Sequence, residues 1–118
     1  MTVHTELGPG LLESTYSACL QYELKAAGFD SFAQVGLPVV YRAIKLDLGY
    51  RIDLVVEDLV VVEIKSVDAI SPVHDAQTLS YLKLSGKGIG LLINFNVVHL
   101  KNGIKRFVNG RNWESESV

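Results

Sequence analysis

The spacing of apolar residues predicts a helix followed by strands in the first half of the chain. Over residues 11–27 apolar side chains recur every three or four positions, the period of an amphipathic helix, and Gly28 stands where such a helix would end. Residues 32–41 read as one extended strand, and Pro38 within it is typical of a sheet edge. Residues 1–10 contain two glycines and a proline and are predicted to form an N-terminal loop.

Two more apolar stretches follow, and then a second helix. Residues 44–56 and 59–65 are rich in β-branched side chains, and the two acidic residues between them predict a β-hairpin. Ser71-Pro72 is a capping residue followed by proline, which predicts the start of a helix. We expect this helix to run to about Ser85 and to end at Gly86.

The apolar pattern in the last third of the chain predicts strands again. Residues 88–95 are almost continuously apolar, as in a strand covered on both faces. Residues 97–100 and 104–108 flank Asn102-Gly103, a strong signal for a two-residue hairpin turn. The expected order is therefore α-β-β-β-α-β-β, an α/β fold with a mixed sheet flanked by helices.

Composition supports one globular domain spanning residues 1–118, with a frayed tail at 111–118 that includes Trp113. The 118 residues are 48% hydrophobic and 20% charged, and the apolar runs are too short to cross a membrane. Cys19 is the single cysteine, which excludes a disulfide framework and a cysteine-ligated zinc site; its place in the apolar stripe of the first helix predicts a core position. No secretory pattern opens the chain, and we expect a cytoplasmic protein.

Charge is distributed unevenly. The formal net charge of −2 excludes a nonspecific polycation. Between residues 83 and 111, however, six residues are basic and none is acidic, which is either a landing surface for a polyanion or a solvated face. The six are Lys83, Lys87, Lys101, Lys105, Arg106 and Arg111.

Three charged residues, Asp53, Glu63 and Lys65, lie within strands that are otherwise apolar. Burying a charge costs several kcal/mol unless the charge is paired or binds a metal. Glu63 and Lys65 are two residues apart and share one face of their strand. A two-residue hairpin loop would place Asp53 opposite Val62, whereas a three-residue loop would place it opposite Glu63.

The second register would bring two carboxylates and an ammonium group together. Two carboxylates at one point repel each other, and a hard divalent cation such as Mg²⁺ relieves that repulsion. The structural alternative is an ion pair of Lys65 with one of the two acids, and the spacing alone leaves both open.

These residues resemble the PD-(D/E)xK nuclease superfamily. Asp53 is followed after nine residues by Glu63-x-Lys65, the acidic and ExK parts of that motif. Residues 10–16 (GLLESTY) match the signature of the GxxExxY family within the superfamily, and residues 77–81 (QTLSY) match the QxxxY helix of its exonuclease-like branch.

The resemblance implies a restriction-endonuclease-like core and hydrolysis of phosphodiester bonds that depends on Mg²⁺ or Mn²⁺. Asp53, Glu63 and the backbone carbonyl of Ile64 would hold the cation, and Glu13 would bind it directly or through water. Lys65 would position the attacking water or stabilise charge in the transition state. Asp53, Glu63 and Lys65 are thus the expected catalytic set.

Accessory roles follow from the same motifs. Gln77 and Tyr81 are four residues apart on one helix face and would contact a phosphate, a base or the ExK lysine; Tyr16 would support the site from the first helix. His4 and His74 are expected to be structural.

The resemblance covers about residues 4–108, with two departures. Ile52 stands where the superfamily name has a proline. Family members usually carry a further helical stretch before the position of His4, whereas this sequence begins almost at that histidine. We therefore expect stability or oligomeric state to be affected, and a homodimer is compatible with the sequence.

The expected function is a nuclease whose partner is nucleic acid, with DNA favoured over RNA and no membrane. The alternative is a catalytically silent module that binds nucleic acid or protein on the same fold. A structural subunit of a larger assembly is a third interpretation.

Overall fold

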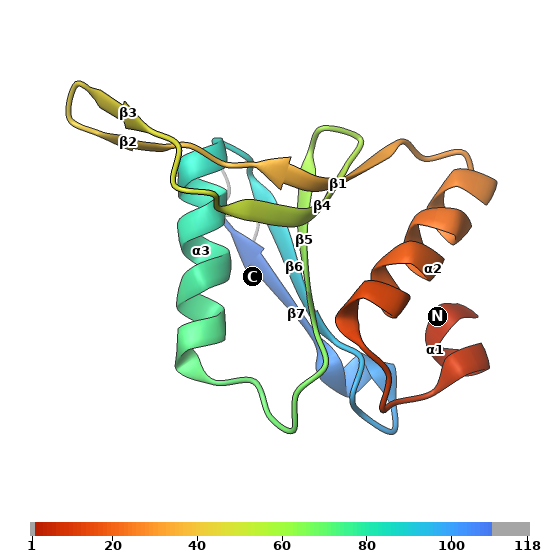
Figure 1. The fold of residues 1–118 in the computed structure, drawn as a ribbon. Helices are drawn as coiled ribbons and strands as arrows, with labels where there is room; N and C mark the ends of the chain where they lie inside the picture. The colour runs from red at the N-terminus through yellow and green to blue at the C-terminus, as the bar shows by residue number, and fades with distance from the viewer. Residues whose placement is uncertain (1, 110–118) are drawn as a thin grey trace.

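The computed structural model describes residues 2–109, which form a mixed sheet with helices on both faces (Figure 1). The sheet has five strands in the order β1-β4-β5-β6-β7, in which β5 and β6 are parallel and the other neighbouring pairs are antiparallel. This confirms the predicted α/β class with a mixed sheet. The strands are β1 (Ser31–Gly36), β4 (Arg51–Val56), β5 (Val60–Lys65), β6 (Ile89–Asn94) and β7 (Ile104–Val108).

The N-terminal segment was predicted as a loop, and this prediction is wrong in part. Thr2–Leu7 is a helix, α1, and the loop is confined to the residues that follow it. Tertiary contacts hold so short a helix in place: Val3 is buried, and Nε2 of His4 is 2.7 Å from the carbonyl oxygen of Val97. The following helix, α2, spans Glu13–Ala26, one residue less at its C-terminal end than predicted. Ala27 is its C-cap residue, and Gly28 follows with a φ of +89°. The predicted helix and its glycine stop are confirmed.

The two long strands predicted over 32–41 and 44–56 are each divided in the structure. The first splits around Pro38 into β1 and β2 (Val39–Tyr41), and the second splits before Arg51 into β3 (Ile44–Leu46) and β4. A local apolar pattern could not show this, because the division comes from Leu37: its side chain is 3% exposed and its N–H donates to the carbonyl oxygen of Tyr50 (2.9 Å). That bond closes the base of a separate β2–β3 hairpin. The predicted sheet edge is confirmed, since β1 is the outer strand.

The second of the two helices predicted from the sequence corresponds to α3 (Pro72–Ser85) and has the predicted bounds. Gly86 ends it with a φ of +72°. The helices cover opposite faces of the sheet (Figure 1). On the α2 face, Tyr16 and Phe95 pack with the sheet residues Leu54 and Ile64. On the α3 face, the core comprises Leu37, Ile52, Val55, Val61, Tyr81 and Leu82. None of the helices within residues 2–109 is long and apolar enough to cross a membrane.

The hairpin predicted around Asn102-Gly103 is wrong. Residues 97–99 are not a strand, and Leu100–Gly103 form a 3₁₀ helix, η1, after which β7 pairs with β6. Tertiary packing overrides the local turn signal, because Leu100 turns into the core and Gly103 lies directly against the carbonyl oxygen of Asn94. The tail 111–118, with Arg111 and Trp113, lies outside the described residues.

We expect Gly103→Ala to destabilise the protein by about 1–3 kcal/mol, the usual cost of overpacking. An added Cβ would meet the Asn94 carbonyl oxygen, which is backbone and cannot move aside, and would lie 3.0 Å from Cγ2 of Val97. Urea unfolding measures the effect. The control is Gly36→Ala, whose Cβ would meet a flexible arginine side chain at 3.6 Å. Equal stabilities of the two variants would contradict the close approach at Gly103.

Candidate active site

The β4–β5 hairpin adopts the three-residue register. Val56 pairs with Val60, so the loop consists of Glu57, Asp58 and Leu59. Glu57 and Asp58 have φ values of +54° and +55°, the left-handed conformation that lets a short loop reverse the chain. In this register the position across from Asp53 is that of Glu63.

The strand pairing is interrupted where Asp53 stands. The β4–β5 pairing ends at Leu54 opposite Val62, and the β1–β4 pairing passes over Gln34, which has a φ of +52°. Such a local distortion re-aims a side chain. The carboxylate of Asp53 turns toward β5, where Oδ2 accepts a 2.8 Å hydrogen bond from the N–H of Ile64.

Glu63 is a buried acid beside Asp53. Its side chain is 2% exposed, and Oε1 has no hydrogen-bond partner among the described residues. Burial raises the pKa of Glu63 to about 9, and the charge of Asp53 and a side-chain hydrogen bond with Asp53 add to the rise. The Lys65 charge acts in the opposite direction. Without a cation, Glu63 is therefore protonated at neutral pH.

Lys65 is half-buried at the end of β5, where its backbone pairs with Asn94 of β6. The ion pairs within residues 2–109 are Arg51–Asp47, Lys87–Asp58 and Lys105–Asp75. Lys65 takes part in none of them, so the alternative of an ion pair between Lys65 and one of the acids is not what the structure shows.

Asn94 is a site-supporting residue that the sequence reasoning missed. It is 2% exposed; its Oδ1 accepts from the N–H groups of Val67 and Asn96 (both 3.1 Å), and its Nδ2 donates to the Val67 carbonyl (2.9 Å). These bonds hold the chain that leaves β5 after Lys65. The signal was available, since Asn94 is a polar residue inside the apolar run 88–95.

The GxxExxY segment lies where α2 meets the end of β5. Ser66, the residue after Lys65, donates its hydroxyl to the carbonyl oxygen of Leu11 (2.7 Å) and ties the two regions together. Glu13 is the first residue of α2 and is exposed. Within residues 2–109 no three acidic, histidine or cysteine side chains gather as a metal site, so the structure does not bring Glu13 into one group with Asp53 and Glu63.

Tyr16 holds the loop of this segment in place from the core. It is 0% exposed, and its ring stacks on Phe95 with centroids 4.4 Å apart. Its hydroxyl donates to the Gly8 carbonyl (2.6 Å) and accepts from the N–H of Leu11 (3.1 Å). Tyr16 therefore shapes the loop before Glu13 and does not present its side chain to a ligand.

Gln77 and Tyr81 lie together on α3. Nε2 of Gln77 donates to the Tyr81 hydroxyl (3.2 Å), and the Tyr81 ring meets Tyr50 edge-on at 6.2 Å. Tyr81 packs on the α3 face of the sheet with Val61. Because side chains alternate along β5, Glu63 faces the same side as Val61, toward α3.

His4 and His74 have structural contacts, in line with their expected structural roles. His4 anchors α1, and Nδ1 of His74 accepts a 3.0 Å hydrogen bond from the N–H of Ser71 at the start of α3.

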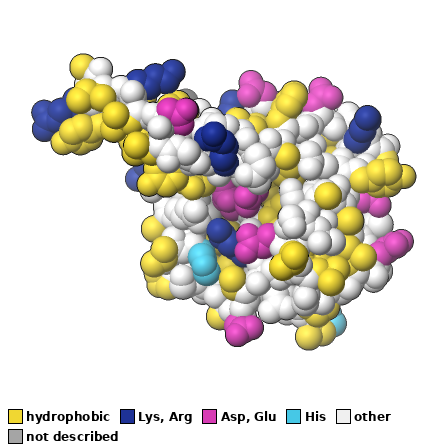
Figure 2. Space-filling model, in the orientation of Figure 1, with side chains coloured by type: hydrophobic (Ala, Val, Ile, Leu, Met, Phe, Trp, Pro, Cys, Tyr) yellow, Lys and Arg dark blue, Asp and Glu magenta, His cyan; other side chains and the backbone are white. Residues whose placement is uncertain are grey.

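Figure 2 shows acidic, basic and histidine side chains gathered in the middle of the face turned to the viewer, in the hollow between α2 and α3.

The basic residues of the C-terminal third divide into paired and unpaired members. Lys87 pairs with Asp58 and Lys105 with Asp75, both at 2.7 Å. The remaining described members are exposed and belong to none of the ion pairs within residues 2–109. They are Lys83, Lys101 and Arg106.

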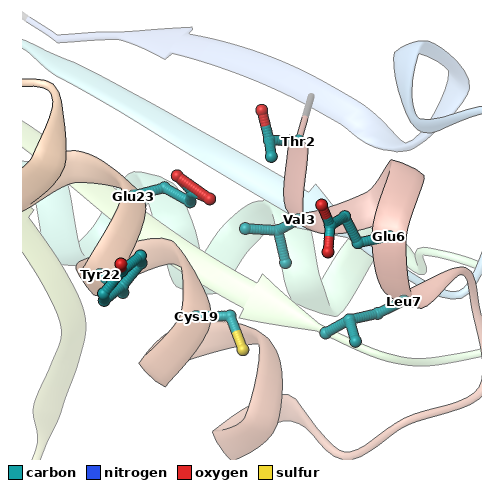
Figure 3. Close-up of a pocket in the computed structure, with 7 residues that line it drawn as sticks. All are labelled: Thr2, Val3, Glu6, Leu7, Cys19, Tyr22 and Glu23. Atoms are coloured by element: carbon teal, nitrogen blue, oxygen red, sulfur yellow. The ribbon is translucent and has the colours of Figure 1, made fainter.

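A separate hollow of about 230 Å³ lies between α1 and α2 (Figure 3). Cys19 and Tyr22 line it from α2, and Val3, Glu6 and Leu7 line it from α1. None of the predicted site residues lines it. Cys19 is half-buried there at the margin of the core.

Comparison with known proteins identifies the family. The chain matches the family model of the PD-(D/E)XK nuclease superfamily over residues 1–107. No curated protein and no solved structure matches it. The mixed sheet with helices on both faces is consistent with a restriction-endonuclease-like fold. This chain belongs to the PD-(D/E)XK nuclease superfamily.

Proposed function

We propose that this protein is a nuclease that hydrolyses phosphodiester bonds with the help of Mg²⁺ or Mn²⁺. The observation that carries the proposal is the pair of acids on adjacent strands, half-buried Asp53 and buried Glu63, in which one carboxyl oxygen of Glu63 lacks a hydrogen-bond partner among the described residues. An unsatisfied buried oxygen costs free energy unless something binds it. Membership of the PD-(D/E)XK nuclease superfamily supports phosphodiester hydrolysis as the reaction that this pair of acids would serve.

The donor atoms at this point suit a hard divalent cation. Asp53, Glu63 and the backbone carbonyl of Ile64 would offer oxygen ligands, which Mg²⁺ and Mn²⁺ prefer. The Oε1 of Glu63, which has no hydrogen-bond partner among the described residues, would be one of these ligands. When bound, the cation would polarise the phosphate and lower the pKa of a bound water.

The other residues would act around this pair. Lys65 would orient the attacking water or stabilise negative charge on the phosphate, since its ammonium is in no ion pair within residues 2–109. Glu13 would reach the cation through water from the start of α2. On α3, half-buried Gln77 would contact the substrate, and Tyr81, which is 7% exposed, would act with it through the hydrogen bond between them. Tyr16 would hold the loop that carries Glu13.

We further assign the chain to the GxxExxY branch, on the strength of residues 10–16 and their structure. Gly10 has a φ of +98°, a conformation that glycine adopts without strain, and Tyr16 bonds the loop that contains it. DNA is the proposed substrate ahead of RNA.

A second candidate is a module that binds nucleic acid or protein without turnover. The observation in its favour is that Glu13 is not assembled with Asp53 and Glu63 among the described residues. Two of the six basic residues are also neutralised by ion pairs.

A cleavage assay separates the two functions. Single- and double-stranded DNA and RNA are incubated with the protein in Mg²⁺, in Mn²⁺ and in chelator, beside Lys65→Ala. We expect metal-dependent cleavage by the native protein and its loss in the variant. Lys25→Ala, an exposed lysine in the last turn of α2, is the matched control and should cleave normally. Binding of nucleic acid without cleavage in either metal would favour the silent module.

Salt dependence tests whether the basic residues contact phosphates. Each phosphate contact releases counterions, so binding should weaken steeply between about 50 and 200 mM salt. Removing one contacting lysine, with Lys101→Ala as the first variant, should reduce the slope of log affinity against log salt by about one. Binding that is indifferent to salt would indicate a protein partner.

A further inference from the structure

The β2–β3 hairpin stands apart from the rest of the fold. It projects beyond α3 (Figure 1), and β2 and β3 pair only with each other among the described strands. Each strand has three residues, and residues 40–51 are all exposed. A two-stranded hairpin of this length is marginally stable in water unless something covers it.

The side chains of this arm are largely apolar. Figure 2 shows hydrophobic side chains covering it, with basic side chains near its end. Six large hydrophobic residues within eleven positions are 38% to 60% exposed. They are Val40, Tyr41, Ile44, Leu46, Leu48 and Tyr50. A contiguous exposed patch of this kind marks an interaction surface.

The outer edge of β3 is free to pair with another strand. Tyr41 pairs with Ile44 across the two-residue turn, and the residues that flank such a turn form a hydrogen-bonded pair. Hydrogen-bonded pairs alternate with non-hydrogen-bonded ones, so the backbone groups of Lys45 point away from β2. The other edge is less suited to pairing, because Pro38 directly before β2 has no N–H.

Charge selects one register for pairing β3 with a second β3. An antiparallel pair centred on Lys45 or on Asp47 would set like charges directly opposite each other, which is destabilising. Centred on Leu46, the pair sets each Lys45 opposite Asp47 of the second copy. Within one copy Asp47 contacts Arg51 at 4.0 Å with both side chains exposed, an ion pair of little energy. Its Oδ1 also accepts a hydrogen bond from the N–H of Gly49 (3.2 Å), so Lys45 of the second copy would replace Arg51 as the charged partner and leave that turn in place.

The same register aligns the apolar residues. Ile44 and Leu46 lie on one face of β3, and Leu48, two residues beyond its end, would continue that face once pairing extends the strand. Pairing centred on Leu46 places Leu46 beside its own copy and Ile44 beside Leu48 of the second copy, at non-hydrogen-bonded positions where side chains approach most closely. One continuous apolar stripe results.

We infer that this arm is a dimerisation surface, on which β3 of one chain pairs antiparallel with β3 of a second copy about a two-fold axis at Leu46. The arrangement is isologous, so each copy supplies the same patch. The composition of the arm favours a protein over nucleic acid, because apolar side chains outnumber Arg42, Lys45 and Arg51 and one acid lies among them. The inference is independent of the nuclease proposal.

Charge reversal tests the register. Sedimentation velocity of the full chain at micromolar concentration should give a mass near twice 13.0 kDa. Lys45→Asp and Asp47→Lys should each weaken association at least about tenfold, because like charges then meet twice across the axis. The double variant, Lys45→Asp with Asp47→Lys, should restore the dimer. Lys101→Asp, a reversal at an exposed lysine on η1, is the control and should leave the mass unchanged.

A cross-link tests the axis itself. In a background with Cys19→Ala, Leu46→Cys should form an intermolecular disulfide on oxidation, since facing residues at a non-hydrogen-bonded position have Cα atoms about 4.5 Å apart. Val40→Cys on β2, where the side chain is 60% exposed against 38% for Leu46, should not. A monomer at every concentration, or a dimer that ignores both single reversals, would overturn the inference. Monomers in which Lys45→Asp weakens duplex binding would make the arm a nucleic-acid contact instead.

Discussion

Asp53→Asn should abolish metal-dependent cleavage while leaving the metal-free fold about as stable as the native one. The amide keeps an oxygen that can accept the hydrogen bond from the Ile64 N–H, now 2.8 Å from Oδ2, so the local structure has no reason to change. It removes the negative charge that would bind a cation. We expect the cleavage rate to fall by at least about 100-fold, the effect of losing one strong electrostatic contact in a transition state.

Thermal melts of the two proteins separate catalysis from stability. Mg²⁺ should raise the melting temperature of the native protein, because a ligand that binds only the folded state stabilises it, by about 2.7 kcal/mol at one hundred times its dissociation constant. Asp53→Asn should lose most of that increment, whereas Asp30→Asn, an exposed acid before β1, should keep it. Strong destabilisation of Asp53→Asn, together with no effect of Mg²⁺ on the native protein, would contradict the metal site and make Asp53 a structural residue.

The elements that could be predicted are those with strong local signals. The α3 helix has a capping serine, a proline at its first position and a glycine stop, and its predicted bounds agree with the structure. The α1 helix has no such local signals. It is stabilised by tertiary contacts instead, namely the burial of Val3 and the contact of His4 with Val97. Similarly, a strand pattern continues through Pro38 without showing that the chain leaves one sheet for another.

The candidate site shows the same division between local and tertiary information. Residue types and spacing indicated Asp53, Glu63 and Lys65, but the register stayed open, since two consecutive acidic residues do not define a loop length. The structure selects the three-residue loop through the left-handed conformations of Glu57 and Asp58. The unpartnered oxygen of Glu63 is a product of tertiary packing and has no signature in the sequence.

Glu63 should make the metal-free protein lose stability as the pH rises from about 4.5 to about 9. Its pKa is raised from 4.5 to about 9 in the folded state, chiefly by burial and then by Asp53. Between these values the folded protein holds a proton that the unfolded chain has released, so the free energy of unfolding falls with pH, by up to about 1.4 kcal/mol per pH unit. Below pH 4.5 both states are protonated and Glu63 contributes no slope.

Glu63→Gln isolates this contribution, because the amide is nearly the same shape and stays neutral at every pH. The variant should show a flatter profile of unfolding free energy against pH and should be the more stable protein above about pH 9, where native Glu63 is charged and buried. Urea unfolding at a series of pH values in chelator measures both curves, with Glu57→Gln, an exposed acid in the hairpin loop, as the control. In Mg²⁺ the native protein should lose much of its slope, since a cation on the unpartnered Oε1 favours the ionised carboxylate, and Glu63→Gln should be unaffected by the metal. Parallel native and Glu63→Gln curves in chelator would mean that Glu63 is already ionised in the fold, and its buried charge would then be stabilised without a metal.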